Sequence, residues 1–277
     1  MPPTKTGLVA LAWVGLLACE GPVNPGGQGT ALPQPLDCVA SVDGVLATDE
    51  LPFVVGVEAT YLRNEPGVPV AFDPAPSEGP DGTRWDFSEG PADVGATLSL
   101  QELSAEAWYA PHFDPDALVG RVALEDPELQ TVWAASPGEL RALGLVSRSP
   151  GAASTLMRYD VAPTMLRTPM EVGHAWGGQH TFRDARLGGA PNAGVEDWSF
   201  SVVDRGDVVL PGDLVVRDVM VLRTEVTRSL AVAAGLEANR ETSFIQQWIG
   251  PCVGELARVE GTDPTLSEVR ELRRLQP

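Results

Sequence analysis

Hydrophobic and polar residues alternate in short runs along most of this chain, and a helical period is almost absent. Trp198, Phe200 and Val202, for example, alternate with Ser199 and Ser201. A period of two places one face of a strand against a core, so this pattern predicts half-buried β-strands. The same pattern predicts strands over residues 53–62, 85–88, 94–100, 118–124, 130–135, 139–146, 155–161, 215–226, 244–248 and 253–259.

Turn-forming residues separate the predicted strands. Gly188-Gly189, Pro211-Gly212-Asp213 and residues 204–207 carry the glycine, proline and aspartate that tight turns favour. Long βαβ crossovers are missing, which favours antiparallel pairing. We therefore predict an all-β fold, either an antiparallel sandwich or a partly open barrel.

The C-terminal residues show a helical spacing. Leu266, Val269 and Leu272 recur at about one helical turn, and Asp263 or Thr265 is placed to cap such a segment. This spacing predicts a short C-terminal helix within the last residues of the chain.

The N-terminus has the layout of an export signal. A lone lysine precedes an apolar stretch, residues 7–18, that is too short to cross a bilayer and ends in a small residue. Leu16-Leu17-Ala18-Cys19 resembles the lipobox of bacterial lipoproteins. The resemblance implies that the Cys19 thiol carries a diacylglyceryl group and that Cys19 begins the mature chain. The alternative is an ordinary signal peptide cleaved near Ala18, with Cys19 a free or disulfide-bonded thiol.

The lipobox resemblance implies a protein that is anchored to a membrane and does not span it. Two or three acyl chains hold a protein on a membrane essentially permanently. In lipoproteins of Gram-negative bacteria, an aspartate after the lipidated cysteine commonly marks retention at the inner membrane. Glu20 stands there instead, which favours the outer membrane, on its periplasmic or its surface face. The membrane, reached through the N-terminal lipid, is therefore an expected partner.

Composition shifts divide the chain into segments. Glycine and proline dominate the residues after Cys19 and leave no periodic apolar face, which is typical of a flexible tether. A Pro150-Gly151 break leaves open whether the following β domain is one continuous sheet or two halves. The predicted layout is a signal peptide at 1–18, a lipidated tether at 19–36, a β domain at 37–261 with possible halves 37–150 and 151–261, and a tail with the short helix at 262–277.

The chain is strongly acidic, with a formal net charge of −19 at pH 7. Such a surface repels phosphate, which excludes nucleic acid as a natural partner and makes an anionic membrane face no electrostatic attractant. Lys5 is the last lysine, so every basic residue after the signal is arginine. No arginine cluster along the sequence is dense enough to indicate anion binding.

Two cysteines remain once Cys19 is set aside. Cys38 lies near the mature start and Cys252 near the end. An even pair in an exported chain predicts a disulfide that ties the two ends together. Two reduced, buried thiols are the alternative. No histidine lies near either cysteine in sequence, so a catalytic cysteine is not supported.

Candidate catalytic chemistry is sparse. The sequence has no Gly-x-Ser-x-Gly elbow and no phosphate-binding Gly-x-x-x-x-Gly-Lys loop. His174 and His180 flank Gly177-Gly178, which suggests a tight hairpin that brings both rings to one end of a sheet. Imidazole suits zinc, so these two histidines are weak candidate metal ligands, but six-residue spacing is not a recognised ligand pattern. Ordinary turn-flanking histidines are the alternative, and no cofactor is predicted.

Two motifs of the β domain carry a second resemblance. Gly173-His174-Ala175-Trp176 and Ile249-Gly250-Pro251-Cys252-Val253-Gly254 are similar to stretches of uncharacterised β-rich envelope lipoproteins, in which Gly-x-x-Trp opens a repeat and apolar-Gly-Pro-x-Val-Gly closes it. The resemblance brings no known activity.

The leading functional hypothesis is a lipid-anchored, non-enzymatic protein of the bacterial envelope that acts by binding or structural interaction, with an envelope protein as its partner. The first alternative is a carrier that holds an apolar ligand in a half-open barrel. A hydrolase is the third. A sizeable apolar cavity would favour the carrier, and convergent titratable groups in a cleft would favour the hydrolase.

Overall fold

The computed structural model describes residues 38–277 except 52, 54, 73, 74, 80, 81, 92, 122–125, 127 and 231–238. The signal peptide predicted at 1–18, the predicted lipidation site Cys19 and the tether predicted at 19–36 lie outside the described residues. In the part that is described, no helix is both long and apolar enough to cross a membrane.

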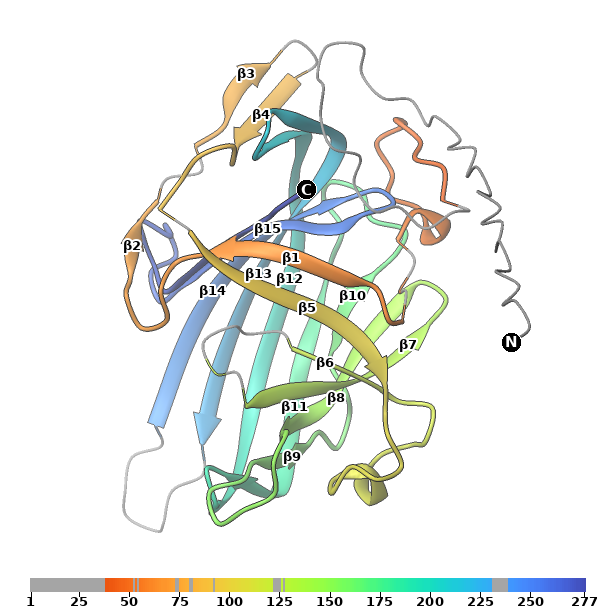
Figure 1. Ribbon diagram of the computed structural model, residues 1–277, viewed down its shortest axis with the longest axis vertical. Coiled ribbons are helices and arrows are strands. Elements are labelled where there is room, and N and C mark those ends of the chain that lie inside the picture. Colours follow the sequence, from red (N-terminus) through yellow and green to blue (C-terminus); the bar gives the residue numbers. More distant parts are fainter. Residues whose placement is uncertain are drawn as a thin grey trace, which may run out of the picture.

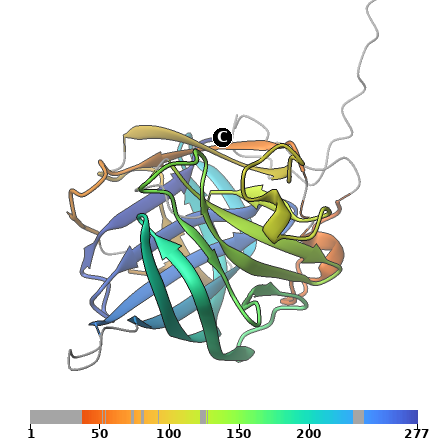
Figure 2. The same cartoon turned by 90° about the horizontal axis from the view of Figure 1, so that it is seen from below.

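The central feature is a closed ring of twelve strands, in which every pairing is antiparallel (Figures 1 and 2). In order around the ring these strands are β1 (Glu58–Arg63), β5 (Val94–Glu102), β6 (Leu118–Gly120), β7 (Leu129–Ser136), β8 (Glu139–Ser147), β9 (Leu156–Arg158), β11 (Ala175–Leu187), β12 (Ala190–Leu210), β13 (Leu214–Leu230), β14 (Asn239–Gly250), β15 (Gly254–Gly261) and β17 (Glu271–Leu275). The ring closes because β11 pairs with both β9 and β12, and β17 pairs with both β15 and β1. The all-β prediction is confirmed, and the fold is the barrel.

Several short elements lie outside the twelve-strand ring. The remaining elements are β2 (Val70–Ala71), β3 (Ser77–Gly79), β4 (Gly82–Asp86), β10 (Thr164–Arg167), β16 (Glu268–Val269) and the 3-10 helices η1 (Thr48–Glu50) and η2 (Ala110–His112). β4 extends the sheet by pairing in parallel with β12, β3 pairs with β4, and β10 pairs with β8. β2 and β16 form a separate two-stranded sheet.

Alternation located most of the ring correctly. The predicted strands at 94–100, 130–135, 139–146, 215–226 and 253–259 fall within or nearly within observed strands. Turns occur at Gly188-Gly189 and Pro211-Gly212-Asp213 as expected, joining β11 to β12 and β12 to β13. One sheet runs through both sides of residue 150, because β8 pairs with β9 and the ring continues into β11.

The turn predicted within the second half of β12 is wrong. Residues 204–207 lie inside β12 and not in a turn. A Cβ on Gly206 would stand 2.1 Å from the Thr83 carbonyl oxygen, so this glycine allows the close approach of the segment that pairs with β12. The bulges beside it let β12 continue as a single long strand.

The predicted C-terminal helix is also wrong, since residues 262–277 contain β16 and β17. Asp263 accepts hydrogen bonds from the Thr265 backbone and the Ser267 hydroxyl, at 3.1 and 2.8 Å, so it organises a turn and not a helix start. Leu266 and Leu272 are buried in a core outside the ring. All five residues of β17 are buried, because both faces of this strand are covered.

Strand alternation divides the buried side chains into an inner and an outer set. Trp248 of β14 faces outward and packs on Trp85 and Phe87, at ring-centroid distances of 6.3 and 4.7 Å. Its neighbours on β14, Gln247 and Ile249, face the other way, and Gln247 lines the interior of the barrel. Trp248 therefore belongs to an outer core, whereas the inner side chains divide between a second core, which contains Ile249, and the wall of a cavity, which contains Gln247.

Candidate functional site

A cavity of about 350 Å³ lies inside the ring. Its walls come from β1, β5, β7, β8, β13, β14, β15 and β17, which are distributed around the ring, and from β10. Leu51 and Phe53, which precede β1, add to the wall. Val57 also lines the cavity and is 46% exposed, so the cavity reaches the surface near the start of β1.

Most of the wall is apolar. Leu98 and Leu100 are two residues apart on β5, so both point inward, and Ala59 on β1 is the cross-strand partner of Leu98. Trp133 and Leu140 add apolar surface from β7 and β8. The alternation of apolar and polar residues that predicted these strands also places their apolar side chains on the inner face, which makes the interior apolar.

One part of the wall is charged. Arg121, Gln247, Glu255, Arg258 and Arg273 form what we call the cavity cluster. Cross-strand register brings three of them together, since Arg258 is opposite Gln247 on β14 and opposite Arg273 on β17. Arg121 follows directly after β6.

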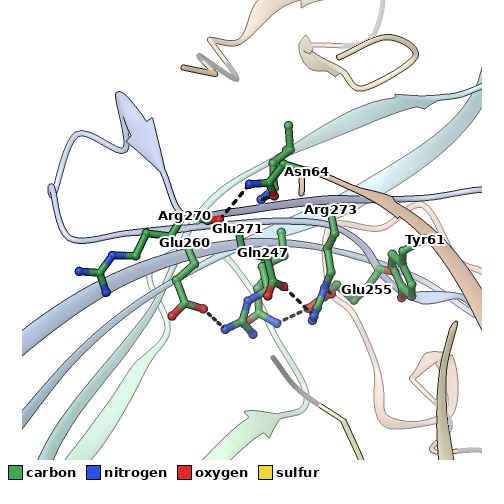
Figure 3. Close-up of polar contacts among 10 residues, drawn as sticks. Tyr61, Asn64, Gln247, Glu255, Glu260, Arg270, Glu271 and Arg273 are labelled. Atoms are coloured by element: carbon green, nitrogen blue, oxygen red, sulfur yellow. Dashed lines mark hydrogen bonds and ion pairs between the residues drawn. The ribbon is translucent and has the colours of Figure 1, made fainter. Parts of the chain in front are cut away.

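Arg273 and Glu255 form a buried ion pair at the centre of this cluster (Figure 3). Arg273 Nε lies 2.5 Å from Glu255 Oε1, and its Nη1 lies 2.9 Å from Glu271 Oε1. Gln247 donates to the second oxygen of Glu255 at 2.5 Å. The Tyr61 hydroxyl donates to the Glu255 carbonyl oxygen at 2.8 Å, and the Arg273 guanidinium lies 5.6 Å from the Tyr61 ring centroid.

These contacts decide the charge states of the pair. Burial by itself raises the pKa of Glu255, but attraction to Arg273 and Arg258 outweighs it and holds the pKa below its usual value. Burial by itself lowers the pKa of Arg273, whereas Glu255 and Glu271 raise it above the usual range. The pair is therefore ionised at neutral pH, and Glu255 is committed to partners within the wall.

The other two arginines bring positive charge to the cavity. Arg258 has a side chain only 6% exposed, and its Nη2 lies 2.5 Å from Glu260 Oε2. Its Nε has no hydrogen-bond partner among the described residues. Burial lowers the pKa of Arg121, and the nearby charges of Arg63 and Arg148 lower it further. Glu271 acts on the pKa of Arg121 in the opposite direction, so Arg121 lies among charged side chains of both signs.

The disulfide expected from the sequence lies beside this cavity. The Sγ atoms of Cys38 and Cys252 are 2.01 Å apart, at bonding distance, and the Cα atoms are 5.5 Å apart. Cys252 itself lines the cavity, and its backbone N–H donates to the Glu50 carbonyl oxygen at 2.6 Å. The segment that leads from Cys38 to Leu51 is therefore fastened to the cavity wall.

The two candidate metal ligands are not brought together. His174 precedes β11 and His180 lies within it, and six residues along a strand span about 20 Å. His174 Nε2 is 2.7 Å from Glu171 Oε1, and His180 Nδ1 is 2.9 Å from the Val161 carbonyl oxygen. Across the described ranges, no group of three or more His, Cys, Asp or Glu side chains is arranged to hold a metal ion.

The hairpin that was expected to join these histidines does not form. Gly177 and Gly178 lie within β11, near its start, and pair with Ser199 and Trp198 of β12. A Cβ on Gly177 would stand 2.1 Å from the Trp198 carbonyl oxygen. Close approach of two strands, and not a turn, explains the glycine.

A second buried polar group lies outside the cavity, and we call it the Glu196 cluster. The fully buried Glu196 carboxylate accepts hydrogen bonds from the Tyr159 hydroxyl at 2.5 Å and from Trp198 Nε1 at 2.9 Å. Arg228 Nε contacts its other oxygen at 2.5 Å. Three donors therefore occupy this carboxylate.

Sequence analysis missed both clusters. Arg121 and Arg258 stand singly and far apart in sequence, and Arg273, although it is next to Arg274, lies in the segment that was predicted to be a helix. One signal was available, since arginine at an inward position of an apolar strand, as in Ala257-Arg258-Val259, is costly unless it is paired.

Searches for similar proteins add no assignment. Neither the models of protein families, nor the curated proteins, nor the solved structures gave a match to this chain.

Proposed function

We propose that this protein binds a small apolar or amphipathic molecule inside its barrel, and that it acts as a carrier or binding protein and not as an enzyme. The observation that supports this function is the cavity. Its volume of about 350 Å³ falls within the range of about 300–1,000 Å³ that is usual for ligand sites, and its wall is mostly apolar.

The cavity changes the order of the hypotheses drawn from the sequence. A protein that acts only by structural interaction needs no empty space between its strands, because dense packing stabilises a barrel best. Cavities of this size cost stability, and they persist where a ligand occupies them or where function requires them. The carrier therefore becomes the better-supported hypothesis.

The proposal also places the carrier on a membrane. With a diacylglyceryl group on Cys19, the barrel would be tethered to the bacterial outer membrane and would load or release its ligand there. The expected evidence is the intact mass of protein purified from its native membrane. A chain that starts at Cys19 and carries added acyl mass supports the anchor, and an unacylated chain refutes it.

Ligand binding is tested by filling the cavity from one strand. Ala59 lines the cavity, whereas its neighbour Thr60 is exposed on the opposite face of β1. We expect Ala59→Phe to weaken binding of a neutral fluorescent dye such as N-phenylnaphthylamine by about tenfold, because the ring would take up space inside the barrel. Thr60→Phe is the matched control and should bind the dye like the unaltered protein.

Two results would refute a ligand site in the barrel. One is an absence of saturable dye binding to unaltered protein that has been stripped of co-purifying lipid. The other is equal dye affinity of the Ala59→Phe and Thr60→Phe variants, with thermal unfolding showing that both are folded.

A further inference from the structure

The ion pair in the cavity wall is complete within the protein. Glu255 pairs with Arg273 and accepts a hydrogen bond from Gln247, each at 2.5 Å (Figure 3). Arg273 also pairs with Glu271 at 2.9 Å. The two lining residues of opposite charge therefore compensate each other, and both make a further polar contact inside the protein.

The other charged side chains among the described lining residues have partners too. Arg258 pairs with Glu260, whose Oε2 lies 2.5 Å from Arg258 Nη2. Arg121 is not free either. An ionised ligand would have to displace one of these contacts or stay unpaired in an apolar interior, and both cost free energy. The wall therefore favours a ligand without charge.

Two neutral polar atoms on lining residues have no hydrogen-bond partner in the described part of the chain. They are the Thr224 hydroxyl oxygen and Trp133 Nε1, and both side chains are buried. Thr224 is opposite Ile245, which also lines the cavity, so the Thr224 side chain is on the inner face of β13. A buried polar atom without a partner is costly, and a neutral oxygen on a ligand would supply one.

We propose that the ligand is an uncharged single-chain amphiphile with a hydroxyl or carbonyl head, and that the Thr224 hydroxyl forms a hydrogen bond with this head while the chain lies along the apolar wall. This inference rests on the proposed function, since it names the class of molecule that the barrel binds. Exchange between staggered rotamers interchanges the positions of the threonine hydroxyl and methyl groups, so the hydroxyl can turn toward the head.

The volume limits the enclosed part of the chain. At roughly 30 Å³ for each water-sized group, a cavity of about 350 Å³ holds about a dozen non-hydrogen atoms. This is the size of decanol, and a larger molecule would extend through the opening beside Val57. Ile245, Leu98 and Leu100 supply apolar surface that such a chain would cover.

Three amphiphiles with the same ten-carbon chain test the charge of the head. We would titrate decanol, decanoate and decyltrimethylammonium against the delipidated full-length protein and measure displacement of the neutral dye. We expect decanol to bind about tenfold or more tightly than either ion, because an ionised head loses its hydration without gaining a partner.

A variant pair tests the position of the head. Thr224→Val keeps the shape of the side chain and removes its oxygen, so it should lose about fivefold of the affinity for decanol. Its affinity for 1-chlorodecane, which has no oxygen, should stay unchanged. Thr227→Val is the matched control on the same strand, because Thr227 does not line the cavity and its hydroxyl already contacts Thr242 Oγ1 at 2.9 Å. This control should bind decanol like the unaltered protein.

The possible failures are distinct. If either ion binds the unaltered protein as tightly as decanol, the uncharged head is refuted while ligand binding in the barrel stands. If the Thr224→Val and Thr227→Val variants, both shown to be folded by thermal unfolding, bind decanol equally, the role of Thr224 is refuted. If none of the three amphiphiles binds, both proposals fail. The ligand series uses the unaltered protein, so it decides the charge of the head even if a variant does not fold.

Discussion

The two buried polar clusters of this barrel use the same side-chain chemistry in different ways. In the Glu196 cluster, one carboxylate accepts hydrogen bonds from Tyr159 and Trp198 and forms an ion pair with Arg228. Its negative charge is therefore matched by one positive charge and two further donors. In the cavity cluster, arginines outnumber the glutamate, and the group borders an open space of about 350 Å³. The Glu196 cluster lies away from the cavity, whereas the cavity cluster forms part of its wall.

If the proposed function is correct, this difference separates a structural role from a binding role. A buried carboxylate with all its donors in place fixes strands against one another and has nothing left for a ligand. The charged groups of the cavity cluster also hold one another, since Arg273 pairs with Glu255, but they border an open space. Burial alone therefore does not distinguish the two clusters, whereas the adjoining cavity does.

The largest expected effect comes from the disulfide, which borders only the cavity cluster. The bond closes a loop of 214 residues in sequence separation, and the chain-entropy model gives about 5 kcal/mol of stabilisation as an upper figure. We expect the Cys38→Ala/Cys252→Ala variant to unfold at lower denaturant concentration and to lose dye affinity. Denaturant titration of both proteins, with and without reductant, measures the change.

Hydrogen exchange makes this prediction specific to one region. Loss of the bond should accelerate exchange of the Leu46 and Cys252 amides, which pair with Met170 and Glu50 beside the cavity. Amides of β12 next to Glu196 should change far less. Equal acceleration in the two regions would contradict the comparison.

Removing one charge from each cluster should have the next largest effect. Glu255→Gln removes one of the two carboxylates that pair with buried Arg273 in the described part of the chain, and we expect a loss of about 3 kcal/mol in the free energy of unfolding. Glu196→Gln should cost less, about 2 kcal/mol, because the Arg228 side chain is 44% exposed and water can solvate it.

The same two variants should differ in ligand affinity. Glu255→Gln alters a side chain that lines the cavity and breaks its ion pair with Arg273, so dye affinity should change while stability falls. Glu196→Gln should leave dye affinity unchanged, because Glu196 does not line the cavity. If Glu196→Gln changed dye binding as much as Glu255→Gln, the Glu196 cluster would not be purely structural.

The course of the chain was largely predictable from the sequence, because a barrel strand has one inward and one outward face. Period-two alternation located β5, β7, β8 and β13 correctly. β17 was missed because it is buried on both faces and does not alternate. Leu266, Val269 and Leu272 happen to be spaced at about one helical turn, and this spacing led to the wrong prediction of a helix.

The candidate site was not predictable in the same way. Arg121, Arg258 and Arg273 meet only because β17 inserts between β15 and β1 and so completes the ring. That pairing joins the C-terminal strand to the first strand of the ring, and no local pattern encodes it. His174 and His180 gave the opposite error, since a motif close in sequence suggested a proximity that an extended strand forbids.

A smaller effect should distinguish the tyrosines of the two clusters. Tyr159 donates to the Glu196 carboxylate, and Tyr61 donates to a neutral backbone carbonyl. Hydrogen bonds to charged groups are stronger, so Tyr159→Phe should cost about 2 kcal/mol and Tyr61→Phe about 1 kcal/mol in unfolding free energy. Only Tyr61→Phe should alter dye binding, because only Tyr61 lines the cavity. Equal costs measured by denaturant titration would contradict this ranking.

The smallest effect is the pH dependence that Glu255 adds in acid. Its pKa is held below the usual value of about 4.3, because Arg273 and Arg258 outweigh the effect of burial. A carboxyl with a lowered folded-state pKa binds fewer protons when folded than when unfolded, so its stabilisation is present above about pH 4.3 and is lost as the pH falls through the folded-state pKa. Unfolding free energies of the unaltered protein and Glu255→Gln, measured from about pH 7 to about pH 3, should therefore converge in acid. A constant difference across this range would show that the Glu255 side chain stabilises the barrel by its shape and not by its charge.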